Sequence, residues 1–301
     1  MGLSHDPHWL RAGNWFTKDS TADFAIIGIG ASQSALTPNR AYKTPNSIRE
    51  ALLRYSTYSA TLDVDLAQHL KAADFGDVSK PDSQDKTIAE LTHHYENART
   101  FLLMGGDNSI TYSGAKALLN FVEPGKLGVI TLDAHHDLRD GTSNGSPIRQ
   151  LLDAGLSGKN IVQIGINDFA NSKFYSDRAK KAGITVIHRR DLEKSSPEQI
   201  AKKALTKLAK CTHLYIDIDM DVCDRTVVPA APAAMPGGIS ADEIRRLVAA
   251  LAQDKRSNHF DITELDSTID APDQRSIRLA ALLILISSAM SNLVQISLQK
   301  N

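Results

Sequence analysis

The stretch KLGVITLDAHHD, residues 126–137, decides the fold class and carries the first chemically informative groups. Residues 126–133 form a nearly continuous apolar run, as expected for a strand that is covered on both faces. After this run, Asp133, His135 and Asp137 occupy alternate positions. In extended backbone, side chains two residues apart point the same way, so these groups share one side. A buried strand that ends in such groups predicts a parallel α/β sheet with a site at the strand's end.

Similar apolar runs recur along the chain, with room for a helix between most of them. Alternating strands and helices without a break in composition predict one three-layer α/β/α domain around a mainly parallel sheet of about eight strands. We assign residues 1–301 to this domain, with residues 1–22 as an N-terminal extension, and residues 74–87 and 225–238 to surface loops. The predicted strands are 24–30, 100–106, 126–133, 160–166, 184–188, 212–219 and 259–265, and the predicted helices are 47–55, 109–122, 196–210, 240–254 and 276–293.

Four of the apolar runs end in clusters of polar residues, namely GGDNSIT (105–111), DAHHD (133–137), DIDMDVCD (217–224) and TELD (263–266). Any single acid here could cap a helix or pair with a loop cation. Several buried carboxylates at one edge of a sheet, however, need compensating positive charge, which divalent cations supply most simply. Carboxylates with one imidazole suit Mn²⁺ or a similar first-row ion better than Ca²⁺ or structural Zn²⁺. Two such ions can activate water as a nucleophile at neutral pH.

The overall composition limits the class of partner. A formal net charge of −1 gives no reason to expect nucleic acid or an anionic membrane surface as a partner. The longest apolar run near the end, residues 279–286, is too short to span a bilayer. The two cysteines, Cys211 and Cys223, lack the spacing of a zinc or redox motif and fit a reducing compartment. We therefore expect a cytoplasmic protein that acts on a small molecule.

The order of these motifs resembles the ureohydrolase family, which includes arginases, agmatinases and formimidoylglutamases. The resemblance rests on GGD-x-S, DAHxD, the alternating acids before a proline-rich loop and the glutamate after the last strand, and it extends from about residue 25 to residue 293. It implies an arginase-like fold and a pair of Mn²⁺ ions per subunit, with Ni²⁺ as an alternative metal. It also implies a homo-oligomer, either a trimer or a hexamer.

The resemblance assigns site residues one by one. The bridging metal ligands fall on Asp133 and Asp219. The terminal ligands fall on His135, Asp137 and Asp221. Asp217 stands where the family usually has serine, so it is expected behind the ligands rather than among them. Glu264 takes the position of the glutamate that faces the substrate, and Asp137 is expected to move a proton.

Two departures from the family pattern affect the metal and the substrate. Asn108 stands where the family usually has a metal-binding histidine, and an amide oxygen is a weaker ligand for a first-row ion. We therefore expect one of the two metal sites to be weak. Asn144 stands where arginases and agmatinases have a histidine, and the sequence SNGSPIR (143–149) is typical of formimidoylglutamases of the Bacillus type.

The resemblance implies hydrolysis of a C=N amidine-type bond, with N-formimino-L-glutamate as substrate and glutamate and formamide as products. Asn144, Arg149 and Arg139 are the candidate contacts to the substrate's carboxylates, because they follow the metal cluster closely. Ordinary loop ion pairs remain an alternative for both arginines. Two other functions stay open: another guanidino or amidino hydrolase, such as a guanidinobutyrase, agmatinase or guanidine hydrolase, and a catalytically silent homologue.

Overall fold

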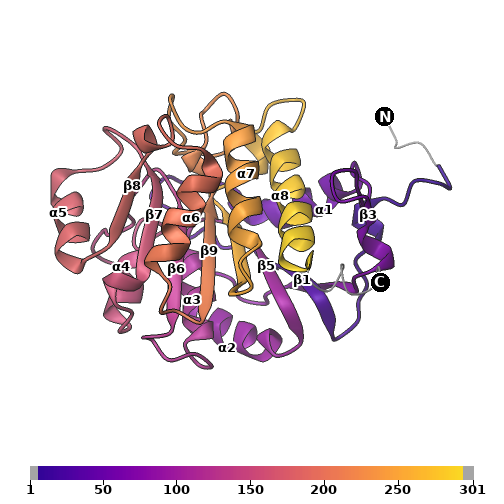
Figure 1. The fold of residues 1–301 in the computed structure, drawn as a ribbon, viewed down its shortest axis with the longest axis horizontal. Helices are drawn as coiled ribbons and strands as arrows, with labels where there is room; N and C mark the ends of the chain where they lie inside the picture. Colours follow the sequence, from indigo (N-terminus) through magenta and orange to yellow (C-terminus); the bar gives the residue numbers. More distant parts are fainter. Residues whose placement is uncertain (1–5, 294–301) are drawn as a thin grey trace.

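The computed structural model describes residues 6–293, and residues 1–5 of the predicted N-terminal extension lie outside this range. Within it, eight strands form one sheet in the order β4-β1-β5-β10-β9-β6-β7-β8, and every neighbouring pair is parallel. Figure 1 shows β8, β7, β6, β9, β5 and β1 across this sheet. The predicted α/β fold class is confirmed. The strands are β1 (Ala22–Ile29), β4 (Ala72–Asp77), β5 (Ala98–Gly105), β6 (Leu127–Leu132), β7 (Ile161–Ile166), β8 (Thr185–His188), β9 (His213–Asp219) and β10 (Ser257–Thr263).

The strand order divides the sheet into two blocks that are each continuous in sequence. Strands β1, β4 and β5 form one block and strands β6 to β9 form the other. The last strand, β10, lies between them and pairs with β5 on one side and β9 on the other. A separate two-stranded antiparallel hairpin, β2 (Tyr58–Ser59) and β3 (Val64–Asp65), precedes β4.

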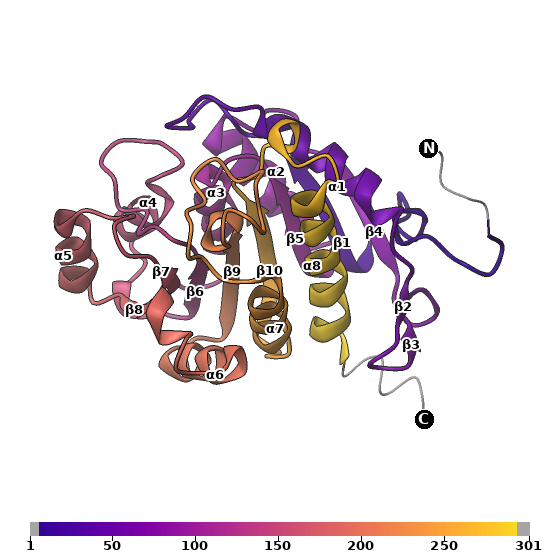
Figure 2. The same cartoon turned by 90° about the horizontal axis from the view of Figure 1, so that it is seen from above.

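Helices cover both faces of the sheet, and each face has its own apolar core. Figure 2 shows α6, α7 and α8 along one face. This layer contains α1 (Thr44–Leu52), α6 (Pro197–Lys207), α7 (Ala241–Ala252) and α8 (Arg275–Ser291). The opposite layer contains α2 (Gln84–Tyr95), α3 (Ser109–Leu118), α4 (Pro147–Asp153) and α5 (Lys173–Ala182). No helix within residues 6–293 has both the length and the apolarity needed to cross a membrane.

The prediction of a surface loop over residues 74–87 holds for residues 78–83 but was wrong at both ends. β4 covers Asp74 to Asp77, and α2 begins at Gln84. The sequence pattern is misleading because β4 is an edge strand that contains two acids and a glycine. Asp74 is buried and its charge is compensated chiefly by Arg49, whose Nε and Nη2 donate to its two oxygens at 2.9 Å each. A buried ion pair supplied by a distant helix leaves no signal in the local sequence.

Parallel pairing places the ends of the central strands at one rim. The neighbours β5, β10, β9 and β6 end next to Asn108, Glu264, Asp219 and Asp133, respectively. The glycine directly after β5, Gly106, has a steric reason, because a Cβ there would lie 2.0 Å from the backbone oxygen of Ala31 in the loop that follows β1. This close approach brings the loop over the rim where ligands bind in such sheets.

Candidate metal centre and its cavity

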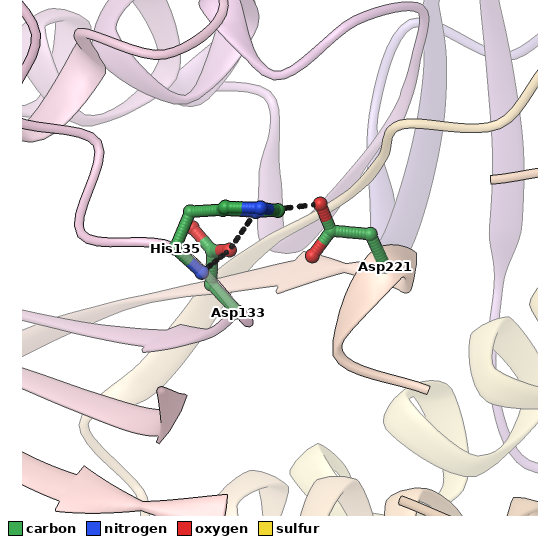
Figure 3. A group of neighbouring side chains, drawn as sticks. All are labelled: Asp133, His135 and Asp221. Atoms are coloured by element: carbon green, nitrogen blue, oxygen red, sulfur yellow. Dashed lines mark hydrogen bonds and ion pairs between the residues drawn. The ribbon is translucent and has the colours of Figure 1, made fainter. Parts of the chain in front are cut away.

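The carboxylate and imidazole ligands predicted from the sequence converge at the ends of β6 and β9. Asp133, His135 and Asp221 form one group whose ligand atoms all lie within 4.8 Å of one another, and Asp133, Asp137 and Asp219 form a second. Figure 3 shows His135 between the other two members of the first group, with Nδ1 2.9 Å from Asp221 Oδ2 and 3.5 Å from Asp133 Oδ1. Asp133 belongs to both groups, so it lies where a residue bridging two ions would be.

Asp137 and Glu264, the two predicted catalytic residues, have left-handed backbone, with φ of 53° and 57°. This conformation is unfavourable for residues other than glycine and persists where the surrounding structure enforces it. Such strain is concentrated at functional sites. Both residues lie at the carboxyl end of the sheet, in the turns that follow β6 and β10.

The carboxylates of the cluster repel one another at close range in a buried setting. Burial and the neighbouring Asp133 raise the pKa of Asp137 well above its ordinary value. Burial and Asp221 do the same to the pKa of Asp219. Burial raises the pKa of Asp133 to about 6 and that of Glu264 to about 7. The protein alone therefore does not supply enough positive charge for this cluster.

His135 is the one cationic group within the cluster itself, among the residues that the structure describes. Burial acts to lower its pKa, but Asp221 and Asp133 outweigh burial and raise the pKa to about 12. Conversely, His135 holds the pKa of Asp221 below its ordinary value although burial acts to raise it. The proton on His135 thus supplies positive charge that a metal ion would otherwise supply, and metal binding would release this proton.

These groups fit a pair of divalent cations. The donor set is oxygen with one imidazole nitrogen, which first-row ions accept. Asp133 Oδ2 is buried and has no hydrogen-bond partner among the described residues, so it retains free acceptor capacity. A buried carboxylate oxygen without a partner is costly, and a bound cation would remove that cost.

Asn108 lies beside the second group, but its amide oxygen does not face the carboxylates. Its Nδ2 donates to Asp137 Oδ2 at 2.5 Å. Its Oδ1 accepts from the hydroxyls of Thr111 at 2.7 Å and Thr263 at 3.0 Å. In this arrangement the atom that the sequence predicted as a weak ligand points away from the ion. Thr111 could have been anticipated as a contact, since residues three apart on a helix are neighbours.

Glu264 is held in place by two donors that share one of its oxygens. Its Oε1 accepts from the backbone N–H of Asn108 at 2.8 Å and from Asn144 Nδ2 at 2.7 Å. Asn144 in turn accepts through Oδ1 from the N–H of Leu36 at 3.0 Å, which ties it to the loop after β1. Within residues 6–293, Oε2 of Glu264 has no hydrogen bond. Asn144, which the sequence predicted to contact the substrate, thus orients Glu264 in this structure.

A cavity of about 180 Å³ opens above the carboxylates. Among the described residues, Arg139 is the only arginine or lysine in its wall, and its guanidinium forms no hydrogen bond or ion pair. Apart from the His135 imidazole, the other side chains around it are acidic or neutral. The lining residues are Leu36, Thr37, Asn39, His135, Asp137, Arg139, Asn144, Gly145, Asp219, Asp221, Pro232, Ala233 and Glu264.

Arg149 does not line the cavity, so the geometry does not support its predicted role as a substrate contact. Its guanidinium is occupied by the backbone oxygens of Arg139 at 2.9 Å and Gly141 at 2.6 Å and by the carboxylate of Asp153. Arg149 therefore holds the loop that carries Arg139. Arg178, which sequence reasoning missed, supports the same loop by donating to the backbone oxygen that follows Asp137 at 2.6 Å.

Asp217 is fully buried and belongs to neither ligand group. It lies beside Asp261, its register partner on β10. Burial and this neighbouring acid raise the pKa of Asp217 well above its ordinary value. The structure thus places Asp219 and Asp221, rather than Asp217, in the candidate metal groups.

Comparison with known proteins gives matches over nearly the whole chain. Residues 22–288 match the model of the arginase family. A formimidoylglutamase of Halalkalibacterium halodurans is 37% identical over 296 residues, which cover 93% of this chain and 92% of the relative. The crystal structure of the formimidoylglutamase from Bacillus subtilis superposes with a TM-score of 0.90 at 30% identity, over 97% of this chain and 95% of that chain. A formiminoglutamase of Trypanosoma cruzi, whose structure contains Mn²⁺, shares the fold with a TM-score of 0.83 at 22% identity, over 94% and 99% of the two chains.

Proposed function

The chain belongs to the arginase family, and we propose that it hydrolyses N-formimino-L-glutamate to L-glutamate and formamide. Formimidoylglutamases of two species, 37% and 36% identical to this chain, support that choice within the family. The geometric observation that carries it is Arg139, whose guanidinium has no partner among the described residues and lies in the wall of a cavity that also contains Asp137, Asp219, Asp221 and Glu264. A substrate with a cationic formimino group at one end and carboxylates at the other matches this distribution of charge.

We assign the two candidate metal groups to two Mn²⁺ ions, with Asp133 between them and Ni²⁺ as an alternative. The Mn²⁺ in the structure of the Trypanosoma cruzi formiminoglutamase supports this choice of metal. When bound, the ions supply Lewis acidity and lower the pKa of water so that it can act as the nucleophile. Asp137, His135, Asp219 and Asp221 complete the proposed ligand set, while Asn108 contributes weakly.

The residues around the ions position the substrate and move a proton. Glu264 Oε2 has no hydrogen-bond partner among the described residues and would hold the cationic formimino group, which would orient its carbon for attack. Water adds to that carbon, and the bond from the carbon to the glutamate nitrogen breaks. Asp137 accepts the two protons of the attacking water in turn and passes them to the leaving nitrogen, which departs as the ammonium group of glutamate. The water oxygen stays with the carbon as formamide.

A substrate panel tests the proposed function directly. The protein is reconstituted with Mn²⁺ and assayed on formiminoglutamate, agmatine, arginine, guanidinobutyrate and guanidine. The highest kcat/KM is expected on formiminoglutamate, with formamide as the product. Highest activity on one of the guanidino compounds would replace the proposed substrate, and no hydrolysis of any compound would favour a catalytically silent protein.

Arg139→Gln is expected to raise KM for formiminoglutamate by about 10-fold or more, with a small change in kcat. The reason is that a hydrogen bond to a charged group contributes about 1.5–3 kcal/mol. Arg149→Gln is the matched comparison, because the same change there loosens the loop without removing a group from the cavity. It should lower thermal stability and reduce kcat as well as raise KM. An unchanged KM for Arg139→Gln would show that Arg139 does not anchor the substrate.

The remaining features stay predictions from the sequence and its resemblance. They are assembly into trimers or hexamers, a cytoplasmic location and a single domain over residues 1–301. Size measurement in solution tests the first of them.

A further inference from the structure

Thr111 lies between Asn108 and a buried carboxylate that belongs to neither candidate metal group. Its hydroxyl oxygen is 2.7 Å from Asn108 Oδ1 and 2.9 Å from Asp261 Oδ2. Thr111, Asp261 and Thr263 are fully buried, and Asn108 is 1% exposed, so water does not compete for these contacts. Tyr215 also donates to Asp261 Oδ2, at 2.7 Å.

A threonine hydroxyl has one proton and can serve only one of these two acceptors at a time. Donation to a carboxylate is roughly twice as strong as donation to a neutral amide oxygen. With Asn108 in its present orientation, Thr111 can donate either to Asp261 Oδ2 or to Asn108 Oδ1, so one of these two acceptors lacks its hydrogen bond. A rotation of the amide by 180° would exchange the positions of Oδ1 and Nδ2, so that Nδ2 would face Thr111. The Thr111 hydroxyl could then accept a hydrogen bond from Asn108 and donate one to Asp261 at the same time.

The turned position also changes what Asn108 presents to the metal group. It places the amide oxygen beside Asp137 Oδ2, where the nitrogen now donates at 2.5 Å. Two acceptor oxygens that close repel each other unless a cation lies between them. The present orientation therefore suits the cluster without an ion, and the turned orientation suits the cluster with one.

We propose that Asn108 is a two-position amide, and that Thr111 and Thr263 are positioning residues that select its metal-binding orientation. With an ion in the group of Asp133, Asp137 and Asp219, the amide oxygen faces the ion. Its two N–H groups then donate to the hydroxyl oxygens of Thr111 and Thr263. This inference rests on the proposed two-metal function and explains how an asparagine can serve in place of a histidine.

The test measures binding of Mn²⁺ itself rather than activity. Wild type, Thr111→Val, Thr263→Val and Thr111→Ser are titrated with Mn²⁺ by calorimetry, and bound metal is counted at fixed free Mn²⁺. Each valine variant is expected to raise the dissociation constant of the weaker ion by about 10-fold, since partners that orient a ligand typically change metal affinity by 10–100-fold. The tighter ion should be unaffected, and Thr111→Ser should restore the wild-type value.

Two control variants separate this role from loss of packing. Thr100→Val makes the same change at a fully buried threonine whose hydroxyl has no partner within residues 6–293, and it should leave both affinities unchanged. Tyr215→Phe removes a different donor from Asp261 without touching Asn108, so it should lower stability but not Mn²⁺ affinity. Circular dichroism checks that each variant folds, and if Thr111→Val does not fold, Thr263→Val and Thr111→Ser carry the test.

The outcomes distinguish this inference from the proposed function. Wild-type affinity for both ions in the folded valine variants would overturn the inference and leave the function standing. Weakened binding in the valine variants, from a protein that hydrolyses no compound of the panel, would support the inference and remove the function. A wild-type protein that binds fewer than two Mn²⁺ ions at saturation would overturn both.

Discussion

Asp133→Asn is expected to abolish binding of the Mn²⁺ pair and to lower kcat/KM on formiminoglutamate by more than about 100-fold. Asp133 is the residue common to both candidate metal groups, and its Oδ2 has no hydrogen bond among the described residues. Loss of a partner that merely orients a ligand costs about 10–100-fold, so loss of a shared ligand should cost more. Metal content after saturation, followed by kinetics, measures both effects.

Stability gives an independent reading of the same variant. Asp133→Asn removes one of several mutually repelling carboxylates, so the metal-free variant should be no less stable than the metal-free wild type. Mn²⁺ should raise the melting temperature of the wild type but not that of the variant, because a ligand that binds only the folded state stabilises it. Asp217→Asn is the matched control, and it should bind two ions because Asp217 belongs to neither group. Two ions bound by Asp133→Asn and fewer by Asp217→Asn would show that the ligands were assigned wrongly.

Glu264→Gln is expected to reduce kcat/KM by about 100-fold while leaving the Mn²⁺ affinity and the fold intact. Both donors to Glu264, Asn144 Nδ2 and the N–H of Asn108, go to Oε1. A glutamine oxygen can accept both, so the amide nitrogen takes the position of Oε2 and the side chain keeps its orientation. The change removes one negative charge that faces the cavity, and a buried charged partner contributes several kcal/mol.

The loss of kcat/KM in Glu264→Gln should occur only with a substrate that carries the cationic formimino group. A neutral analogue, in which oxygen replaces the formimino N–H, should bind Glu264→Gln at least as well as it binds the wild type. Equal kcat/KM for wild type and Glu264→Gln on formiminoglutamate would show that Glu264 does not hold the cation. Asn144→Ala provides a graded comparison, because it removes one of the two donors and leaves the charge in place.

The sequence predicts every strand of the large sheet except β4, which lies at one edge. Strands β5, β6, β9 and β10 are buried on both faces, so their apolar runs are continuous and their ends are marked by the polar clusters. Asp133, His135 and Asp137 do reach the candidate metal groups as predicted, but β6 ends at Leu132 and Asp137 has left-handed backbone, so the alternation of an extended strand is not what places them. β4 was missed because the charge it buries is compensated chiefly by Arg49, which lies 25 residues earlier in the sequence.

The orientation of side chains in the site could not be predicted from the sequence. Asn108 was expected to offer its oxygen to a metal, yet its orientation depends on Thr263, which lies 155 residues away. Arg139 and Arg149 looked equivalent in the sequence, but only Arg139 reaches the cavity, since Arg149 bonds the backbone of the loop between them. The orientation of each of these side chains is determined by donors and acceptors that become its neighbours only in the folded chain.

The position of β10 at the junction of the two sequence blocks determines when the site can exist during synthesis. The ribosome releases the N-terminal block first and then the block that carries Asp133 and Asp219. Each block can begin to pair its own strands, but Asn108 and Asp137 cannot be held together until β10 enters between β5 and β9. A nascent chain that ends before residue 257 would therefore expose two unpaired strand edges in the middle of its sheet. Insertion of the final strand closes those edges and adds Glu264, so the enzyme acquires its chemistry in the same step that protects it from aggregation.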